Sequence, residues 1–379
     1  MRPHRVDFAS RDIKGARGTV GGQPNRMITP VDMEKRPRFA DLGIELGTTR
    51  RGPANSLVDV PGVLVGNCSV IHGDENTASP SGPARTGVTC IFPKDVNLYK
   101  NNVRAAVHVF NGFGKSVGLV QIAELGVLES PLLLTNTLSV WLAADSLAGW
   151  LSDRNPGSYT FNPVVMECND GYLNDIIGQH VKHEHVIRAL DSANSVPFEE
   201  GCVGAGVGMT GYGWKAGIGT SSRRCVVGGA TYTVGVLVLT NTGAAPELRI
   251  GGVSVGLKLQ PPDEDTVTGD GSIIIVIGLD APLSSRQLLR VARRGVFGLA
   301  RTGVTGRHGS GDFILAFSNS ADPPSLRDEE LNLFFAMAVD ATEEAIINSL
   351  LQARTTSGIA GHIRHAIPVE ALKKLLGIH

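Results

Sequence analysis

Two hydrophobic periods alternate along the chain after residue 53. Short runs rich in β-branched and aromatic residues predict strands at 63–65, 88–92, 105–110, 132–134, 164–167, 232–239, 273–277 and 313–317. Between them, apolar residues at three- and four-residue spacing predict helices at 117–125, 140–151, 183–193, 285–300, 325–351 and 368–377. Neither internal repeats nor a long linker interrupts the alternation. The pattern therefore predicts one α/β domain in which helices pack on sheets.

The first 53 residues differ from the rest, being polar, Arg-rich and punctuated by Gly and Pro. Such composition predicts an N-terminal arm over 1–53 that is poorly structured or forms an interface strap. The remaining 54–379 then form the single folded domain. Within it, the helix at 325–351 has a start signal in Ser325, with Asp328 three residues later as a variant capping box.

Charge and composition exclude several classes of partner. The 35 basic and 36 acidic side chains give a net charge of −1, which argues against a nucleic-acid or anionic-membrane partner. The first 22 residues lack the apolar segment of a secretory signal peptide, and no apolar run is long enough to span a membrane. We therefore expect a cytoplasmic protein. Five scattered cysteines and a GxGxxG match at 206–211 without a following helical pattern give no reason to expect a metal or a cofactor.

The segment around Ser272 is chemically the most informative. A polar, glycine-punctuated loop ends at Gly271 and runs directly into an apolar strand that begins with Ser272. This arrangement is compatible with a simple turn before a buried strand. It is also compatible with attack of the Ser272 hydroxyl on the Gly271 carbonyl, since glycine can adopt backbone conformations denied to other residues. Ser272 would then become a new N-terminus, whose α-amine has a pKa suited to activating its own hydroxyl.

Polar residues at two other strand ends are candidates to support Ser272. Ser310 and Asp312 precede an apolar strand and lie two residues apart, so they can share one face and orient the Ser272 hydroxyl and amine. Asn241 ends another strand, where its amide can donate to an oxyanion or merely cap a turn.

Several stretches, taken together and in order, resemble the L-aminopeptidase/D-esterase family, which includes the β-peptidyl aminopeptidases. They cover about 55–318 and are VDVPGVLVGN, GPARTGVTCIFP, LLTNTLSV, DGYLNDIIGQHV, GCVGAGVGMTGYGWKAGIGTSSR, VGVLVLTN, GDGSIIIVIGLDAPL and the SGD cluster at 310–312. The resemblance implies a four-layer αββα sandwich similar to that of the N-terminal-nucleophile hydrolases. It also implies self-cleavage between Gly271 and Ser272, which divides the catalytic domain into 54–271 and 272–379.

The resemblance further implies roles for individual residues. Ser272 is the expected nucleophile, with Ser310 and Asp312 beside it, and Asn241 is the expected oxyanion donor. Glu167 matches the carboxylate that binds the free amine of a small peptide, amide or ester substrate. Family members assemble as homo-oligomers of αβ units, and the same is expected here.

Three positions depart from the family pattern. Asn169, also expected to contact substrate, stands where many members have an aromatic residue, in some a tyrosine. Asp312 stands where glutamate is frequent, and Leu239 where glutamine is common. These departures affect the expected substrate specificity and leave the hydrolase class unchanged.

Two other functions are compatible with this sequence. Acyltransferases of the ornithine acetyltransferase type also process themselves, but they use threonine where this chain has Ser272. A binding protein could keep the fold without the chemistry, and Asn169 keeps this alternative open.

Overall fold

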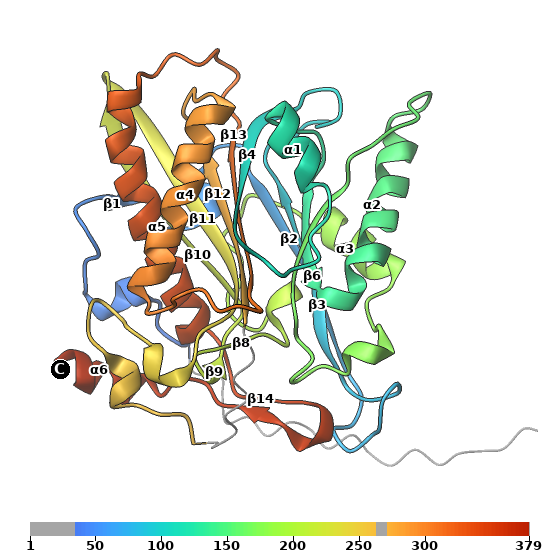
Figure 1. Ribbon diagram of the computed structural model, residues 1–379, viewed down its shortest axis with the longest axis vertical. Helices are drawn as coiled ribbons and strands as arrows, with labels where there is room; N and C mark the ends of the chain where they lie inside the picture. The colour runs from blue at the N-terminus through green and yellow to red at the C-terminus, as the bar shows by residue number, and fades with distance from the viewer. Residues whose placement is uncertain (1–34, 263–270, 379) are drawn as a thin grey trace, which may run out of the picture. The chain divides into compact units, whose positions relative to one another are not determined.

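The computed structural model describes residues 35–262 and 271–378, and its centre is a large mixed sheet (Figure 1). Seven strands form this sheet in the order β1-β10-β11-β12-β13-β4-β5. Their bounds are Arg50–Arg51, Ile218–Val227, Ala230–Asn241, Ser272–Leu279, Gly311–Ser318, Val103–Gly112 and Val127–Leu128, respectively. Central strands β12 and β13 pair in parallel, whereas β11 and β4 flank them antiparallel.

A second sheet faces the first. Its strands follow the order β2-β3-β6-β7, with bounds Leu64–His72, Ala84–Phe92, Leu132–Asn136 and Val164–Cys168. Two small hairpins are separate from both sheets; they pair β8 with β9 and β14 with β15, with bounds Thr210–Gly211, Trp214–Lys215, Thr356–Ser357 and Ile363–Arg364.

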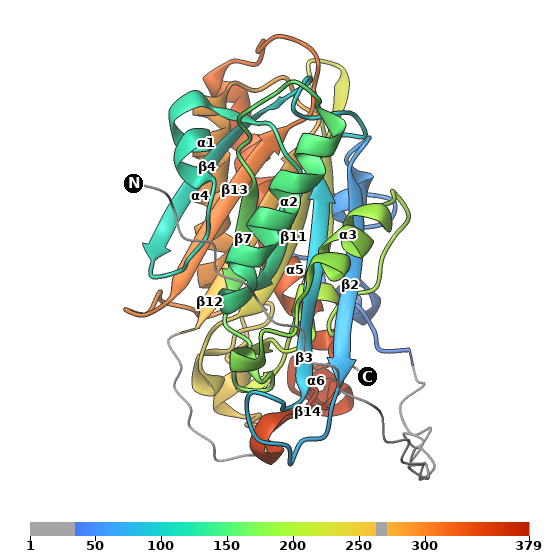
Figure 2. The same ribbon diagram turned by 90° about the vertical axis from the view of Figure 1, so that its right-hand side faces the viewer.

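Helices cover the outer face of each sheet, so that the order of layers is αββα (Figures 1 and 2). On the large sheet, α4 (Ser285–Arg301) packs over β13 and β4, while α5 (Leu331–Leu351) packs over β10 and β11. On the second sheet, α2 (Val140–Arg154) lies over β6 and β7, and α3 (His183–Asp191) over β2 and β3. The expected four-layer sandwich is confirmed.

After Ser272, strand β12 is apolar at every position, and its packing shows why. Ile273, Ile275 and Ile277 pack in the cluster that contains α4 and α5, whereas Ile274 and Val276 pack in the cluster between the two sheets. Alternate side chains of a strand point to opposite faces, and here both faces are buried.

The remaining helices are short. α1 (Leu119–Leu125) begins two residues later than predicted, and α6 (Val369–Leu376) follows Pro368 and ends at Gly377, as the sequence indicates. None of the described helices combines the length and the apolar character needed to cross a membrane.

The predicted start of the long helix at Ser325 is wrong. The α-helix begins at Leu331, after a single 3-10 turn over Asp328–Glu330. Asp328 does not cap it, because its carboxylate binds Arg286 at 2.7 Å and Arg290 at 3.0 Å on α4. The backbone N–H of Ser325 donates to Pro282 O instead.

The sequence does not predict strand β10, because five consecutive polar residues occupy its middle. Ser221, Ser222 and Arg223 lie in its middle and are buried. Arg223 pairs with Glu344 of α5 at 2.7 Å, and Ser221 Oγ donates to the α5 carbonyl of Ala341. Helix α5 therefore satisfies polar side chains that, in the sequence, are typical of a loop.

The predicted arm over 1–53 falls in two parts. Residues 1–34 lie outside the described residues. From Arg36 onward, the chain contacts the folded domain, since Arg36 donates to Leu351 O and Phe39 is fully buried in the α4–α5 cluster. The backbone N–H of Phe39 donates to Asn348 Oδ1 of α5.

Candidate active site

Ser272 is the first residue of the central strand β12. It pairs with Asn241 at the end of β11 and with Gly311 at the start of β13. Its hydroxyl donates to Gly271 O at 2.6 Å and accepts a long hydrogen bond of 3.4 Å from the Gly311 N–H. The side chain is almost fully buried. The hydroxyl thus lies beside the carbonyl of the peptide bond that is expected to break.

Gly271 has a backbone conformation that favours glycine. Its φ is +79°, and a Cβ at this position would lie 2.9 Å from Thr242 Cα and 3.0 Å from Asn241 O. A larger residue would displace the chain just before Ser272. The preceding loop residues 263–270 lie outside the described residues.

Asn241 is held with a defined orientation of its amide. The Thr210 N–H donates to its Oδ1 at 2.9 Å, and its Nδ2 donates to Asn169 O at 2.9 Å. Since an amide nitrogen carries two hydrogens, one N–H remains to donate elsewhere. Directly opposed residues of an antiparallel pair share a face, so this donor and the Ser272 hydroxyl lie on the same side of the sheet.

Ser310 and Asp312 lie next to the backbone of the nucleophile strand. Asp312 pairs with Ile273, the residue after Ser272, and its side chain is completely buried. Burial raises the pKa of Asp312, and the Ser310 hydroxyl and Ile273 N–H offset that rise in part. Among the described residues, neither its carboxylate nor Ser310 Oγ forms a hydrogen bond of standard geometry, and neither binds Ser272 Oγ. Their predicted roles toward the mature α-amine stay predictions.

Glu167 is the penultimate residue of β7 in the second sheet and is 2% exposed. The backbone N–H of Lys115 donates to its Oε1 at 2.8 Å, and the Thr137 hydroxyl donates to its Oε2. These two donors fix the carboxylate. Sequence reasoning did not single out Lys115 or Thr137 as functional residues, although Thr137 lies within the family-like stretch LLTNTLSV.

Two glycines allow a close approach of the chain between Ser272 and Glu167. A Cβ on Gly311 would lie 2.8 Å from Gly114 N and 3.4 Å from Ser272 Oγ. A Cβ on Gly114 would lie 3.3 Å from Glu167 Oε1 and 2.4 Å from the Phe313 ring. Gly114 therefore connects the nucleophile on one sheet to the carboxylate on the other, because the chain crosses between the sheets here.

Asn169 follows β7 and is exposed, in a loop whose next residues are buried or half-buried. Its side-chain Oδ1 accepts from the Gly171 N–H at 2.9 Å, so the amide folds back on its own loop, while its carbonyl holds Asn241. The next residue, Asp170, is fully buried, and burial raises its pKa to about 7. The predicted substrate contact of the Asn169 side chain stays a prediction.

The fold and this site define a class of protein: the N-terminal-nucleophile hydrolases, in which a strand-initiating residue sits between two helix-covered sheets. Residues 55–364 match the model of Peptidase family S58. This chain belongs to that family and is a hydrolase, an aminopeptidase.

Individual relatives are similar over most of their lengths. A β-peptidyl aminopeptidase, BapA, of Sphingosinicella microcystinivorans is 40% identical over 366 residues, which cover 90% of this chain and 92% of the relative. The PH0078 protein of Pyrococcus horikoshii OT3 has a crystal structure with a TM-score of 0.85 at 44% identity, covering 90% of this chain and 99% of that one. An L-aminopeptidase D-Ala-esterase/amidase from Ochrobactrum anthropi, described as a prototype for the serine aminopeptidases and a variant of the Ntn hydrolase fold, gives 0.82 at 36% identity, covering 90% and 98%.

Proposed function

We propose that this aminopeptidase generates its nucleophile by cleaving its own Gly271–Ser272 bond. The main support is the 2.6 Å hydrogen bond from Ser272 Oγ to Gly271 O, at a glycine with positive φ. Attack of Oγ on the Gly271 carbonyl carbon breaks the amide and forms an ester, with the proton passing to the Ser272 nitrogen. Water then hydrolyses the ester, which leaves Gly271 with a carboxylate and Ser272 with a free α-amine.

The mature site then acts on substrates with a free N-terminal amine. The protonated amine docks on Glu167, whose orientation is set by Lys115 N–H and Thr137, and the substrate carbonyl oxygen receives the spare N–H of Asn241. The α-amine of Ser272 takes the proton of its own hydroxyl as Oγ attacks the carbonyl carbon. The leaving amine or alcohol departs, and water releases the acyl group from Ser272.

The substrate class is a small peptide, amide or ester, in agreement with the activities named for the relatives. The carboxylate that recognises the amine is nearly buried, so a blocked amine would leave a charge without its partner. Asn169, in place of an aromatic side chain, leaves this part of the substrate region open and polar.

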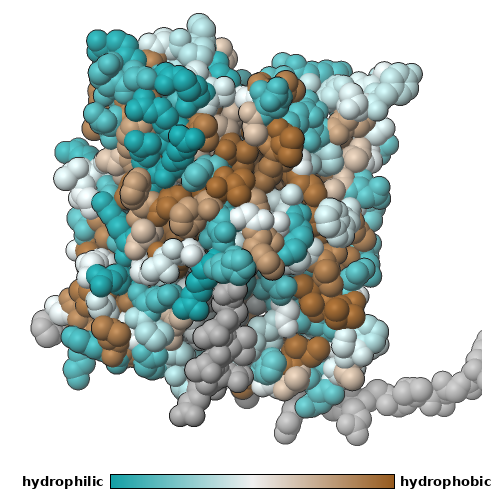
Figure 3. Space-filling view, viewed as in Figure 1, coloured by the Kyte–Doolittle hydropathy of each residue, from teal (hydrophilic) through white to brown (hydrophobic). Residues whose placement is uncertain are grey.

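Self-association into homo-oligomers is part of the proposal. Strand β4 pairs with β5 only at Val103 and Arg104, so its edge beyond Ala105 has no strand partner among the described residues. Apolar side chains gather around this edge, between α4 and α1 (Figure 3); Val109, Phe110, Leu125 and Phe297 are exposed. Exposed apolar patches of this kind mark interfaces. A cytoplasmic location stays a prediction from sequence.

The test compares freshly expressed protein with Ser272→Ala on a denaturing gel with intact-mass analysis. We expect two fragments of roughly 28 and 11 kDa for the unaltered chain, from the average mass of a residue, and one uncleaved chain for the variant. The processed protein is then assayed on amino-acyl p-nitroanilides and their N-acetylated counterparts. A single band for the unaltered chain would overturn self-cleavage, and equal rates on both substrates would overturn amine docking.

A further inference from the structure

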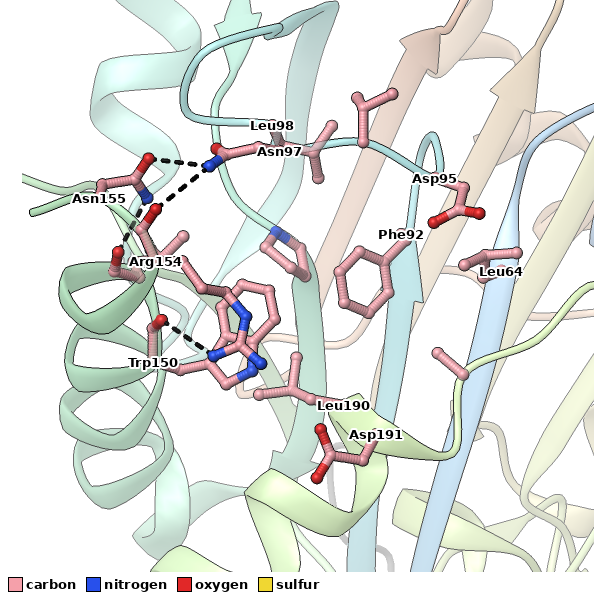
Figure 4. A pocket seen from close by; sticks show the side chains of 14 residues that line it. Leu64, Phe92, Asp95, Asn97, Leu98, Trp150, Arg154, Asn155, Leu190 and Asp191 are labelled. Carbon is pink, nitrogen blue, oxygen red and sulfur yellow. Dashed lines mark hydrogen bonds between the residues drawn. The ribbon is translucent and has the colours of Figure 1, made fainter.

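A cavity lies between the second sheet and its helices, away from Ser272. It has a volume of about 470 Å³ and is lined where β2 begins, β3 ends and the C-terminal ends of α2 and α3 meet (Figure 4). Pro131, which lines it, precedes β6, whereas Thr137 at the opposite end of β6 contacts Glu167. Five strand residues, at about 3.3 Å each, separate the two regions by roughly 16 Å.

Part of the cavity wall is apolar. Leu64, Phe92, Leu190 and Trp150 contribute to it, and the rings of Phe92 and Trp150 meet edge to face with centroids 5.9 Å apart. A volume of this size is within the range of pockets that hold small molecules. The wall is therefore suited to a bulky hydrocarbon or aromatic group.

An exposed arginine stands on one side of the cavity. The Arg154 guanidinium stacks on the Trp150 ring at 3.8 Å, and its Nη1 makes only a long contact of 3.5 Å to Trp150 O. Among the described residues it has no carboxylate partner, which leaves most of its N–H donors available. Stacking orders the guanidinium in advance, so a ligand pays little to immobilise it.

Two carboxylates stand on the other sides. Asp95 lies in the loop after β3 and Asp191 ends α3, and neither forms a hydrogen bond or an ion pair within the described part of the chain. In Figure 4 the Arg154 side chain lies on one side of the cavity, whereas the two aspartates lie across and below it. Cationic and anionic groups thus border the same apolar space without neutralising each other.

We propose that this cavity binds a zwitterionic amino acid or dipeptide with a large apolar side chain. The ligand carboxylate pairs with Arg154, its ammonium group with Asp95 and Asp191, and its side chain packs on Phe92 and Leu190. A simple anion would also face two carboxylates, and a simple cation would also face Arg154. A neutral apolar molecule would pair with none of these three charged groups, which are all exposed. A zwitterion satisfies both signs. This assignment does not depend on the chemistry proposed at Ser272.

Calorimetric titration of the full chain carrying Ser272→Ala tests the ligand class. The probes are L-phenylalanine, 3-phenylpropanoate and 2-phenylethylamine, which share the ring and differ only in the charged groups. We expect saturable binding of L-phenylalanine and at least tenfold weaker binding of each one-charge analogue, in line with the contribution of a charged hydrogen bond. No saturable binding, or equal binding of either analogue, would overturn the proposal.

Substitutions assign the binding to this cavity. Arg154→Met should weaken L-phenylalanine binding at least tenfold, and Asp191→Asn should also weaken it. Arg188→Met is the control, at an exposed position of α3 outside the cavity lining, and should not change the binding. Glu167→Gln should leave this binding intact. Unfolding midpoints of all variants check the fold. Loss of binding in Glu167→Gln with retention in Arg154→Met would place the ligand at the active site and refute the second site.

Discussion

At the scale of single residues, Asn241 is equipped to stabilise an oxyanion because both ends of its amide are already oriented. Thr210 N–H fixes the oxygen and Asn169 O fixes one N–H of the nitrogen. The second N–H needs no reorganisation during the reaction, and preorganised donors are the most effective.

Replacing this amide should affect chemistry more than binding. We expect Asn241→Ala to lower kcat about 10²–10³-fold, as is typical for loss of one oxyanion donor, with a much smaller change in KM. The measurement is steady-state kinetics on an amino-acyl p-nitroanilide, using only material that a gel shows to be processed. A loss of less than about fivefold would remove Asn241 from this role.

Asp170, which follows Asn169 in the loop after β7, should make the folding stability depend on pH. Burial raises its pKa to about 7, although Asn174 and Thr86 hydrogen bonds oppose the rise. Its usual pKa of 3.8 applies to the unfolded chain, so the folded state holds the proton more tightly. The contribution of Asp170 to folding stability is therefore greatest below about pH 4 and is lost as the pH rises toward about 7.

Asp170→Asn should remove this pH dependence. The difference in unfolding free energy, variant minus unaltered chain, should grow in favour of the variant from about pH 4 to about pH 7 and then level off. Urea unfolding of Ser272→Ala protein with and without Asp170→Asn, at several pH values, measures it. Other titrating groups cancel in the difference, so a flat profile would contradict the assignment.

At the scale of elements, a buried ion pair joins β10 to α5. Arg223 and Glu344 are 1% and 0% exposed, and their atoms lie 2.7 Å apart. Arg51 and Asn55 also donate to Glu344, at 2.9 Å and 2.6 Å. These contacts tie the chain before β2, strand β10 of the large sheet and helix α5 into one network.

We expect Arg223→Met to destabilise the protein by about 3 kcal/mol, near the lower end for a broken buried pair, because Glu344 keeps Arg51. Arg224→Met, at the exposed neighbouring position, is the matched control and should change stability by less than about 0.5 kcal/mol. Chemical denaturation provides both values. Equal effects of the two substitutions would argue against a special role for the pair.

At the scale of the whole molecule, the two products of cleavage share one sheet. Residues from 272 onward supply β12 and β13, while β11 and β4 from the preceding segment pair with them on either side. Ile273, Ile275 and Leu279 of β12 are completely buried. Separating the chains would break two strand interfaces and expose this core.

The processed chains should therefore stay together without denaturant. We expect both fragments to co-elute in size-exclusion chromatography, at the position of uncleaved Ser272→Ala, and to separate only in a denaturing gel. Two resolved native peaks would contradict this sheet arrangement.

The sequence by itself determined the elements with strong hydrophobic periods and the serine that follows a glycine at the start of a buried strand. Helices α2 and α4 and strands β11 to β13 lie close to their predicted bounds because both burial and local preference act on the same residues. The sequence also indicated Asn241, Ser310 and Asp312 as candidate site residues, because polar residues at the ends of apolar strands can be recognised from the local sequence.

Tertiary structure decided what depends on distant partners. Strand β10 is buried because α5 supplies acceptors for its polar side chains, and Asp328 binds arginines of α4 instead of capping a helix that starts at Ser325. Lys115 reaches Glu167 because the chain crosses between the sheets, and Thr137 reaches it because β6 lies beside β7 in the second sheet. Arg154 and Asp191 line one cavity because the ends of α2 and α3 converge. The physical reason is the same in each case. Each contact joins residues from separate segments of the chain, so the sequence around one residue does not reveal its partner.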